Sequence, residues 1–339
     1  MSVNANGHIT GHHFAVGPPQ IDMSKYRYVY KGPEIFPPVP EVDGFIPPPK
    51  SIAAAHNHFW IDTEYITIPK DIKWDIYPQP SRTAQPGGQG SYLARLPPGY
   101  EEGKERYPVL IWLHGGMQTQ RDAIWALQYY GRKMEEGKMP KTIIVAPQAL
   151  PKGRYIDNFD GTRPIATILS HDLIKALDQK YRTIRHRSAR WIEGFSMGGY
   201  GTLHLGFTYP EIFSALSSIA PACLPHITDE MPAVVADTYG TNPDFYDVTH
   251  PYHLVGANIS QINSSGTKVR VFTGSLDIRL TAAIDRLMKR FDQVGLQYQH
   301  RESEGAAHVY PHILAGAGSW VTEWWTEVAK SIVRPEFES

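Results

Sequence analysis

Short apolar runs and amphipathic segments alternate along most of the chain. A continuous apolar run, which is typical of a strand buried on both faces of a parallel sheet, occupies residues 108–113, and a second buried strand is predicted over residues 142–146. Further strands are predicted over residues 189–193, 213–220 and 269–273. Helical periodicity predicts helices over residues 121–137, 165–180, 198–207, 280–291 and 319–333. Shorter patterns predict further strands over residues 64–69, 90–96 and 298–302. Strands that alternate with helices predict an α/β fold with a doubly wound, mostly parallel sheet and helices on both faces.

Two stretches interrupt this pattern. Residues 1–50 contain a Pro-rich segment that cannot form a regular helix, because each proline lacks an N–H donor and fixes φ. We expect this N-terminal arm to pack on a single domain formed by residues 51–339. Residues 223–267 show neither the strand nor the helix pattern, and we interpret them as an insertion or a long loop.

Composition excludes several classes of protein. Hydrophobic residues make up 42% and charged residues 20% of the chain, a balance typical of an ordered globular protein and not of a disordered one. The formal net charge is −1, so no basic field attracts nucleic acid. The single cysteine, Cys223, excludes an intramolecular disulfide and a Cys-based zinc site.

The chain also lacks the sequence signals of a membrane or exported protein. Its apolar runs are too short to span a bilayer. The first residues show neither the basic nor the apolar region of a signal peptide, which predicts a cytoplasmic protein. A secreted protein that has lost its leader remains the alternative.

The strongest chemical signal is the segment Gly194-Phe195-Ser196-Met197-Gly198, which matches the pattern G-x-S-x-G. A predicted strand precedes it and a predicted helix follows it, which is the context of a nucleophile elbow. The two glycines let the backbone make a tight turn that exposes the Ser196 hydroxyl above the sheet. The alternative is a glycine-rich helix start in which Ser196 is only an N-cap.

A second signal is His114-Gly115-Gly116 at the end of the buried run 108–113. Acyl transfer needs two backbone N–H groups directed at the developing oxyanion. One comes from the residue after the nucleophile, Met197, and we assign the other to Gly116 in this loop, with Gly115 and Met117 as its neighbours.

An acid and a base are expected after the later strands, in the order Ser, acid, His. Asp277 directly follows the predicted strand 269–273 and His308 follows the strand 298–302, so both belong to the sheet edge that carries Ser196. The other candidates for the acid and the base are Asp237, Asp244, Asp247, Asp285, Asp292, His300 and His312.

Other histidines raise the possibility of a metal site. His56 and His58 form an H-x-H pair, and His8, His12 and His13 cluster near the start of the chain. Neither group has an H-E-x-x-H pattern or a supporting carboxylate spacing, so we predict no metal. The segment GGQG at residues 87–90 is too short for a phosphate-binding loop, and we predict no cofactor.

These motifs resemble the esterase D-type putative esterase family, which includes bacterial feruloyl and acetylxylan esterases. The resemblance covers roughly residues 92–333 and rests on LHGG (113–116), TIIVAPQ (142–148), GFSMGGYG (194–201), TGSLD (273–277) and EGAAH (304–308). It implies an α/β-hydrolase fold without a cofactor. It also implies these roles: nucleophile Ser196, acid Asp277, base His308, and oxyanion donors Gly116 and Met197.

The sequence differs from the family in two places. Feruloyl esterases tend to carry an aromatic residue shortly after the catalytic histidine in an H-D-x-x-W-like pattern, whereas Val-Tyr-Pro-His follows His308. The Pro-rich arm has no counterpart in the family. The resemblance therefore leaves the substrate open.

Together these features predict a serine carboxylic ester hydrolase that acts through an acyl-enzyme. The expected substrate is an aromatic, feruloyl-like ester or an acetyl ester of a carbohydrate or natural product. Two alternatives remain: an acyltransferase or natural-product tailoring enzyme with the same acyl-enzyme, and a non-catalytic binding protein on the same fold. The sequence leaves the oligomeric state open.

Overall fold

The computed structural model describes residues 2–3, 9–10, 60–62 and 68–334. Most of the predicted N-terminal arm, residues 1–50, lies outside the described residues. So do His56, His58 and most of the predicted strand 64–69. Near the start of the chain, β1 (Ser2–Val3) pairs with β2 (Ile9–Thr10) as an antiparallel ladder.

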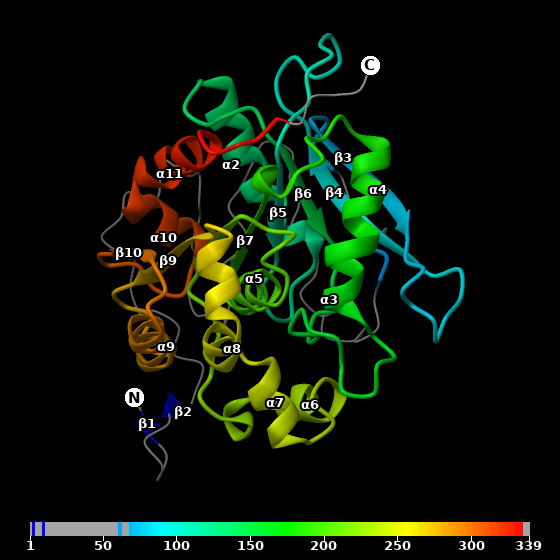
Figure 1. Ribbon diagram of the computed structural model, residues 1–339. Helices are drawn as coiled ribbons and strands as arrows, with labels where there is room; N and C mark the ends of the chain where they lie inside the picture. Colours follow the sequence, from blue (N-terminus) through cyan, green and yellow to red (C-terminus); the bar gives the residue numbers. More distant parts are fainter. Residues whose placement is uncertain (1, 4–8, 11–59, 63–67, 335–339) are drawn as a thin grey trace.

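A twisted eight-stranded sheet forms the centre of the described structure (Figure 1). Its strands are β3 (Ile72–Pro78), β4 (Gln89–Arg95), β5 (Val109–Leu113), β6 (Ile143–Pro147), β7 (Arg190–Phe195), β8 (Ala215–Ile219), β9 (Lys268–Gly274) and β10 (Tyr298–Ser303). They are arranged in the order β10-β9-β8-β7-β5-β6-β4-β3. β4 runs antiparallel to β3 and β6, and the pairs from β6 to β10 are parallel. The predicted doubly wound, mostly parallel sheet is therefore confirmed.

Helices cover both faces of this sheet. One face packs against α2 (Ile124–Glu135), α10 (Tyr310–Ala317) and α11 (Trp320–Ala329). The other packs against α4 (Leu173–Lys180), α5 (Met197–Thr208), α8 (Pro251–Ser264) and α9 (Thr281–Val294). Shorter elements are η2 (Gln120–Ala123), α3 (Ile165–Thr167), η3 (Ile168–Asp172), η4 (Arg187–Ala189), η5 (Ile227–Asp229), α6 (Pro232–Asp237) and α7 (Pro243–Thr249).

Two parts of the chain, β3 and residues 223–267, differ from the sequence-based expectation. β3 is an outer strand with several exposed positions, so it lacks the apolar run by which buried strands are recognised. The stretch 223–267 is largely helical and contains α6, α7 and α8, whereas we expected an insertion or long loop. Each of these three helices begins with a proline. Helix α10 likewise has a proline in its first turn. Proline is tolerated in a first helical turn, although in a sequence it also marks a break.

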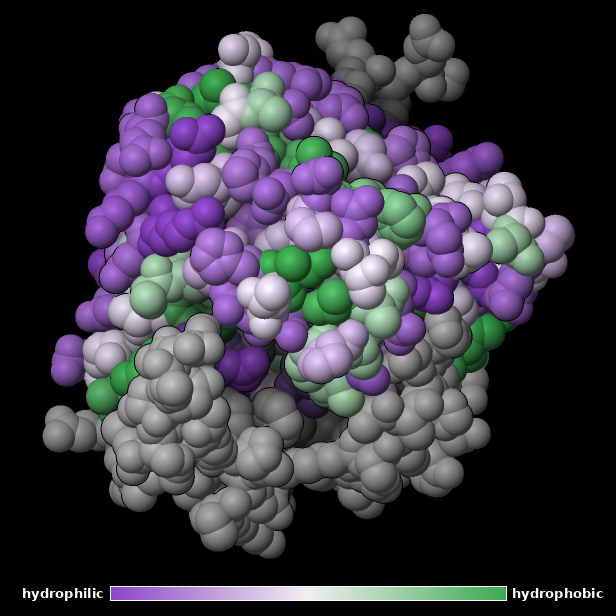
Figure 2. All heavy atoms as spheres, turned by 90° about the horizontal axis from the view of Figure 1, so that it is seen from below, coloured by the Kyte–Doolittle hydropathy of each residue, from purple (hydrophilic) through white to green (hydrophobic). Residues whose placement is uncertain are grey.

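The two helical layers leave few large apolar side chains at the surface. Figure 2 shows one face of the molecule, on which polar side chains predominate and hydrophobic ones gather in a small group near the middle. Among the described residues, exposed large hydrophobics include Met231 and Val248. No helix in this part of the chain is long and apolar enough to cross a bilayer.

A buried ion pair lies within the core, between Glu193 of β7 and Arg270 of β9. Both side chains are fully buried, and the Arg270 guanidinium lies 3.3 Å from Glu193 Oε2. The hydroxyl groups of Ser217 and Tyr130 donate to the Glu193 carboxylate at 2.7 and 2.6 Å. Tyr310 of α10 donates to the same carboxylate at 3.2 Å. This network joins three strands to the helices on one face of the sheet.

The turn between β7 and α5 depends on two glycines. A Cβ atom at Gly198 would overlap with the carbonyl oxygen of Leu113, and one at Gly194 would overlap with that of Gly198. These neighbours are backbone atoms, which cannot rotate away as a side chain would. The helix therefore approaches the ends of β5 and β7 more closely than any larger residue would allow.

Gly198→Ala should accordingly destabilise the fold. The added methyl group must displace backbone on both β5 and α5, so we expect the free energy of unfolding in urea to fall by about 3 kcal/mol or more. Gly116→Ala is the control, since its new Cβ would lie 3.7 Å from Met197 Cβ, an ordinary contact. Equal urea midpoints for Gly198→Ala and the wild type would contradict this account of the turn.

Several histidines are buried in the folded protein. Burial lowers the pKa of His114 and of His204 from 6.5 to about 4, and that of His250 to about 3. The charged imidazolium is thus disfavoured in the folded state relative to the unfolded chain. Their contribution to stability is complete above pH 6.5 and is lost as the pH falls toward 4.

We therefore expect the free energy of unfolding to decrease on acidification between pH 6.5 and 4. In His204→Gln this dependence should be weaker by up to about 1.4 kcal/mol per pH unit, because one proton fewer is taken up on unfolding. Urea unfolding of the two proteins at several pH values measures the difference. Identical slopes would show that His204 takes up no proton on unfolding in this range.

Candidate active site

Ser196 occupies the turn between β7 and α5 with a strained backbone. Its φ is 58° and its ψ is −113°, a conformation that costs free energy for a residue with a side chain. The Ser196 N–H donates to the Ile219 carbonyl at 2.9 Å, and its carbonyl accepts from the N–H groups of Tyr200 and Ala222 at 3.0 Å each. These hydrogen bonds hold the strained turn in place.

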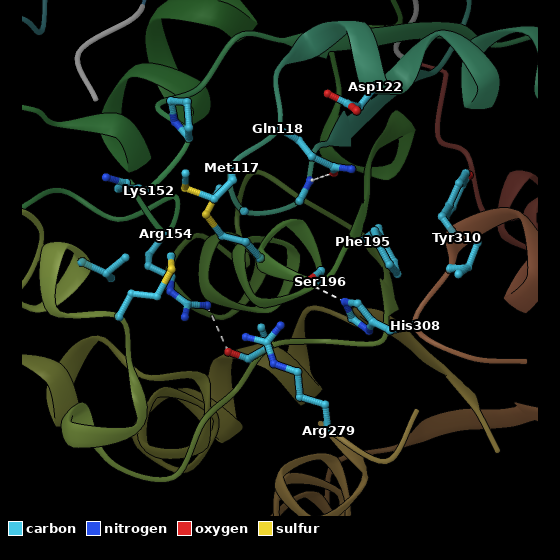
Figure 3. A pocket seen from close by; sticks show the side chains of 18 of the residues that line it. Met117, Gln118, Asp122, Lys152, Arg154, Phe195, Ser196, Arg279, His308 and Tyr310 are labelled. Atoms are coloured by element: carbon cyan, nitrogen blue, oxygen red, sulfur yellow. Dashed lines mark hydrogen bonds between the residues drawn. The ribbon is translucent and has the colours of Figure 1, made fainter. Parts of the chain in front are cut away.

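His308 lies between Ser196 and Asp277. Figure 3 shows its imidazole beside Ser196. Its Nε2 is 2.9 Å from Ser196 Oγ, and its Nδ1 is 2.6 Å from Asp277 Oδ2. The ring of Phe195 packs on the imidazole, with a centroid separation of 4.6 Å. The three residues predicted from separate loops are therefore brought together in one hydrogen-bonded chain.

Asp277 is held rigidly at the end of β9. Its N–H donates to the Gly274 carbonyl at 2.9 Å, and its own carbonyl accepts from the Thr281 hydroxyl at 2.7 Å at the start of α9. The side chain is 2% exposed, and its Oδ1 makes no hydrogen bond with the described residues. The short contact with His308 is thus the main polar interaction of this buried carboxylate.

The loop after β5 leaves one N–H available beside Ser196. The Gly115 N–H donates to Gln118 Oε1 at 2.7 Å, and the Met117 N–H donates to the Pro151 carbonyl at 2.8 Å. Within the described part of the chain, the Gly116 N–H has no such acceptor. Gly116 also lies against Met197, the first residue of α5. This arrangement favours Gly116 over its two neighbours as an oxyanion donor.

His114 fixes the orientation of that peptide. Its buried, neutral imidazole lies 2.9 Å from the carbonyl oxygens of both Gly115 and Ala149. In a trans peptide the C=O and N–H groups point in opposite directions. With the Gly115 carbonyl directed at His114, the Gly116 N–H is therefore directed away from His114.

The alternative acids and bases have other surroundings. His300 Nε2 lies 2.8 Å from Thr273 Oγ1, and burial lowers the pKa of His312 on α10 to about 4. Asp244 and Asp247 lie on α7, where Asp247 is 3.8 Å from His253. Asp237 ends α6, and Asp285 and Asp292 belong to α9. Neither His300, His312 nor any of these aspartates is among the residues that line the pocket at Ser196.

The histidines that raised the possibility of a metal site are not tested in the part of the chain that the structure describes. No group of three or more His, Cys, Asp or Glu side chains is placed there to hold a metal ion. His8, His12 and His13 lie outside these residues, as do His56 and His58.

A pocket of about 160 Å³ opens at Ser196. One wall is aromatic and includes Trp112, Trp125, Phe195 and Tyr310. The other carries three methionines and three cationic side chains: Met117, Met197, Met231, Lys152, Arg154 and Arg279. Of these residues, Met197 and Met117 were named from the sequence, and both only in connection with the backbone N–H groups of the oxyanion site. The sequence could have indicated Arg279, because it follows the predicted acid Asp277 by two positions in the loop after β9.

Comparison with solved structures identifies the fold. A ferulic acid esterase superposes with a TM-score of 0.63 at 20% identity and covers 76% of this chain and 98% of its own. FphF, a fluorophosphonate-binding serine hydrolase of Staphylococcus aureus, gives 0.62 at 16% identity, with 75% and 97% covered. An S-formylglutathione hydrolase of Agrobacterium tumefaciens gives 0.59 at 16% identity, with 76% and 96% covered. The α/β-hydrolase fold predicted from the sequence is confirmed.

Sequence comparison finds two kinds of relative. An esterase of Mycobacterium tuberculosis is 33% identical over 127 residues, which are 36% of this chain and 27% of that protein. The chain thus matches about a quarter of that esterase's length. An uncharacterized protein of Corynebacterium glutamicum is 22% identical over 305 residues, which are 85% of this chain and 71% of that protein.

The family described as "Putative esterase" matches residues 84–331, well over half of the chain. This match includes Ser196, Asp277 and His308 as well as the loop after β5. It agrees with the class of enzyme predicted from the sequence, an ester hydrolase, and with the solved structures that share the fold. The chain belongs to the putative esterase family of α/β-hydrolases.

Proposed function

We propose that this protein is a serine carboxylic ester hydrolase that uses Ser196, His308 and Asp277 as a catalytic triad. The observation that supports this most strongly is the continuous chain of hydrogen bonds from Ser196 Oγ through His308 to Asp277, at 2.9 and 2.6 Å. A hydroxyl, an imidazole and a buried carboxylate in this order form the arrangement that activates a serine nucleophile. Membership of an esterase family supports ester hydrolysis independently.

The first half of the reaction acylates Ser196. His308 Nε2 accepts the hydroxyl proton as Oγ bonds to the ester carbonyl carbon. The carbonyl π electrons move to oxygen, and the N–H groups of Gly116 and Met197 stabilise that oxyanion. His308 then donates the proton to the alcohol oxygen, the C–O bond breaks and the alcohol leaves. Asp277 stabilises the imidazolium that exists between these two proton transfers.

The second half releases the acid. A water molecule gives a proton to His308 Nε2 and adds to the acyl carbon, which again forms an oxyanion beside Gly116 and Met197. Collapse of this intermediate breaks the bond to Ser196 Oγ, which recovers its proton from His308. The enzyme returns to its starting state without a cofactor.

The pocket favours esters with a small or planar acyl group. Its volume of about 160 Å³ suits an acetyl group or a single aromatic ring. The aromatic wall of Trp125, Phe195 and Tyr310 offers ring faces and edges for such a group. A ferulic acid esterase is among the proteins with the same fold. We therefore retain aromatic, feruloyl-like and acetyl esters of carbohydrates or natural products as the proposed substrates.

Ser196→Ala should abolish turnover while leaving the fold intact. We expect kcat for 4-nitrophenyl acetate to fall by about 10⁴-fold or more, because the residual rate comes from binding and oxyanion stabilisation alone. A fluorophosphonate should label the wild type at Ser196, detectable by mass spectrometry of the tryptic peptide. Ser264→Ala, an exposed position on α8, is the control for loss of a serine hydroxyl. Turnover by Ser196→Ala at the wild-type rate would refute the proposed mechanism.

Asp277→Asn should fold normally and lose most of its activity. The amide no longer stabilises the imidazolium and favours the wrong tautomer of His308, so we expect a decrease in kcat of about 10⁴-fold. Asp244→Asn and Asp247→Asn on α7 are matched controls that change the same group outside the pocket. If one of these two variants loses activity and Asp277→Asn does not, the acid is misassigned.

A further inference from the structure

The pocket at Ser196 carries more positive than negative charge. Its lining includes three cationic side chains, Lys152, Arg154 and Arg279, and one acidic side chain, Asp122. Cations placed in a concave, partly apolar site attract an anionic ligand more strongly than cations on an open surface. The question is which of the three charges is available to a ligand.

The Arg154 side chain is engaged in contacts within the protein. Its guanidinium forms a buried ion pair with Glu230, donates to the Ala222 carbonyl at 3.1 Å and lies over the ring of Tyr200 at 5.5 Å. Burial raises the pKa of Glu230, and the charges of Arg154 and then Arg279 act in the opposite direction. The Glu230 carboxylate is thus paired with Arg154 and also lies within the field of Arg279 and, more weakly, that of Asp229.

Arg279 and Lys152 lack such contacts within the described part of the chain. Within the described part of the chain, neither side chain forms an ion pair or donates a hydrogen bond. Arg279 is exposed at the pocket and follows Asp277 by two residues. Figure 3 shows its side chain extending from the loop after β9 toward the region between Arg154 and Ser196. A ligand bound at Ser196 can therefore reach an unpaired guanidinium.

Asp122, the one acid among the described residues that line the pocket, lies on the other side. In Figure 3, Asp122 and Arg279 lie at opposite ends of the pocket, with Ser196 between them. The Asp122 carboxylate accepts a hydrogen bond from the Thr119 N–H at 2.9 Å as part of a capping box. Burial raises the pKa of Asp122 to about 6, which reduces its negative charge in mildly acidic solution. Asp122 therefore does not neutralise the cations across the site.

We propose that Arg279 binds an anionic group such as a carboxylate that the ester substrate carries in addition to the scissile ester. The planar guanidinium matches a carboxylate in a bidentate geometry, and Lys152, elsewhere in the pocket lining, adds to the positive potential of the site. This inference rests on the proposed ester hydrolysis and narrows its substrate class to anionic esters. It makes Arg279 a specificity-determining residue.

Matched pairs of esters test this proposal. On the acyl side, 4-nitrophenyl butyrate is compared with 4-nitrophenyl monosuccinate, in which a carboxylate replaces the terminal methyl group. On the alcohol side, 4-acetoxybenzamide is compared with 4-acetoxybenzoate. For each pair, kcat/KM for the anionic ester is divided by kcat/KM for the neutral ester. An effect of a substitution that is common to both esters cancels in this ratio. The two pairs distinguish which part of the substrate carries the charge.

In Arg279→Gln this ratio should fall about fivefold for at least one pair, mainly through KM, and Arg279→Glu should lower it further. Lys152→Gln should lower it less. Lys289→Gln removes the same charge from an exposed position on α9 outside the pocket, and its ratio should equal that of the wild type. Raising the ionic strength from about 0.02 to about 0.5 M should shrink the difference between wild type and Arg279→Gln.

The proposal is wrong if Arg279→Gln and Lys289→Gln give the same ratio for both pairs, or if the wild type hydrolyses the neutral esters and neither anionic one. Failure of the underlying esterase function has a different result. In that case the wild type hydrolyses no ester of either pair, or Ser196→Ala retains the activity.

Discussion

Helix α5 lies against the ends of β5 and β7 at backbone-to-backbone distance, and the geometry of the site follows from this approach. A side chain at Gly194 or Gly198 would overlap with neighbouring backbone, so glycine is required at both positions. The same turn places Ser196 at φ 58°, and hydrogen bonds to its N–H and carbonyl offset the strain. The Ser196 hydroxyl and the start of α5 consequently lie beside the loop that follows β5.

A second constraint lies beneath the site. Glu193 precedes Ser196 by three residues on β7, and Arg270 precedes Asp277 by seven on β9. Tyr310, two residues after His308, donates to the Glu193 carboxylate. The buried ion pair thus ties together the three segments that carry the proposed triad. Because removal of one partner would leave an uncompensated charge in the core, at a cost of about 3–5 kcal/mol, the network strongly favours one relative placement of these segments.

The polar groups around the pocket are of two kinds. Some are held by contacts within the protein, and others face the pocket, where a ligand can contact them. His114 is buried and neutral and holds the peptide that presents the Gly116 N–H, while Arg154 is engaged by Glu230. Arg279 and the aromatic wall line the pocket, where a ligand can contact them. Groups that must not move during acyl transfer are therefore held by the protein, and groups that select the substrate face the pocket.

Local patterns in the sequence were sufficient for β5 and β6, because a strand buried on both faces of the sheet is a continuous apolar run. Strands were also predicted at β7 and β9, although each carries a buried charge, Glu193 or Arg270. Parallel strands end at one edge of a sheet, so chain order alone predicted that Ser196, Asp277 and His308 lie near one another, and the structure places them within hydrogen-bond distance. The same patterns missed β3, whose exposed positions interrupt its apolar run, and α6–α8, whose initial prolines resemble breaks. The convergence of Lys152, Asp122 and Arg279 on one pocket was decided only by the tertiary structure, because it depends on loops held by contacts between residues far apart in the chain.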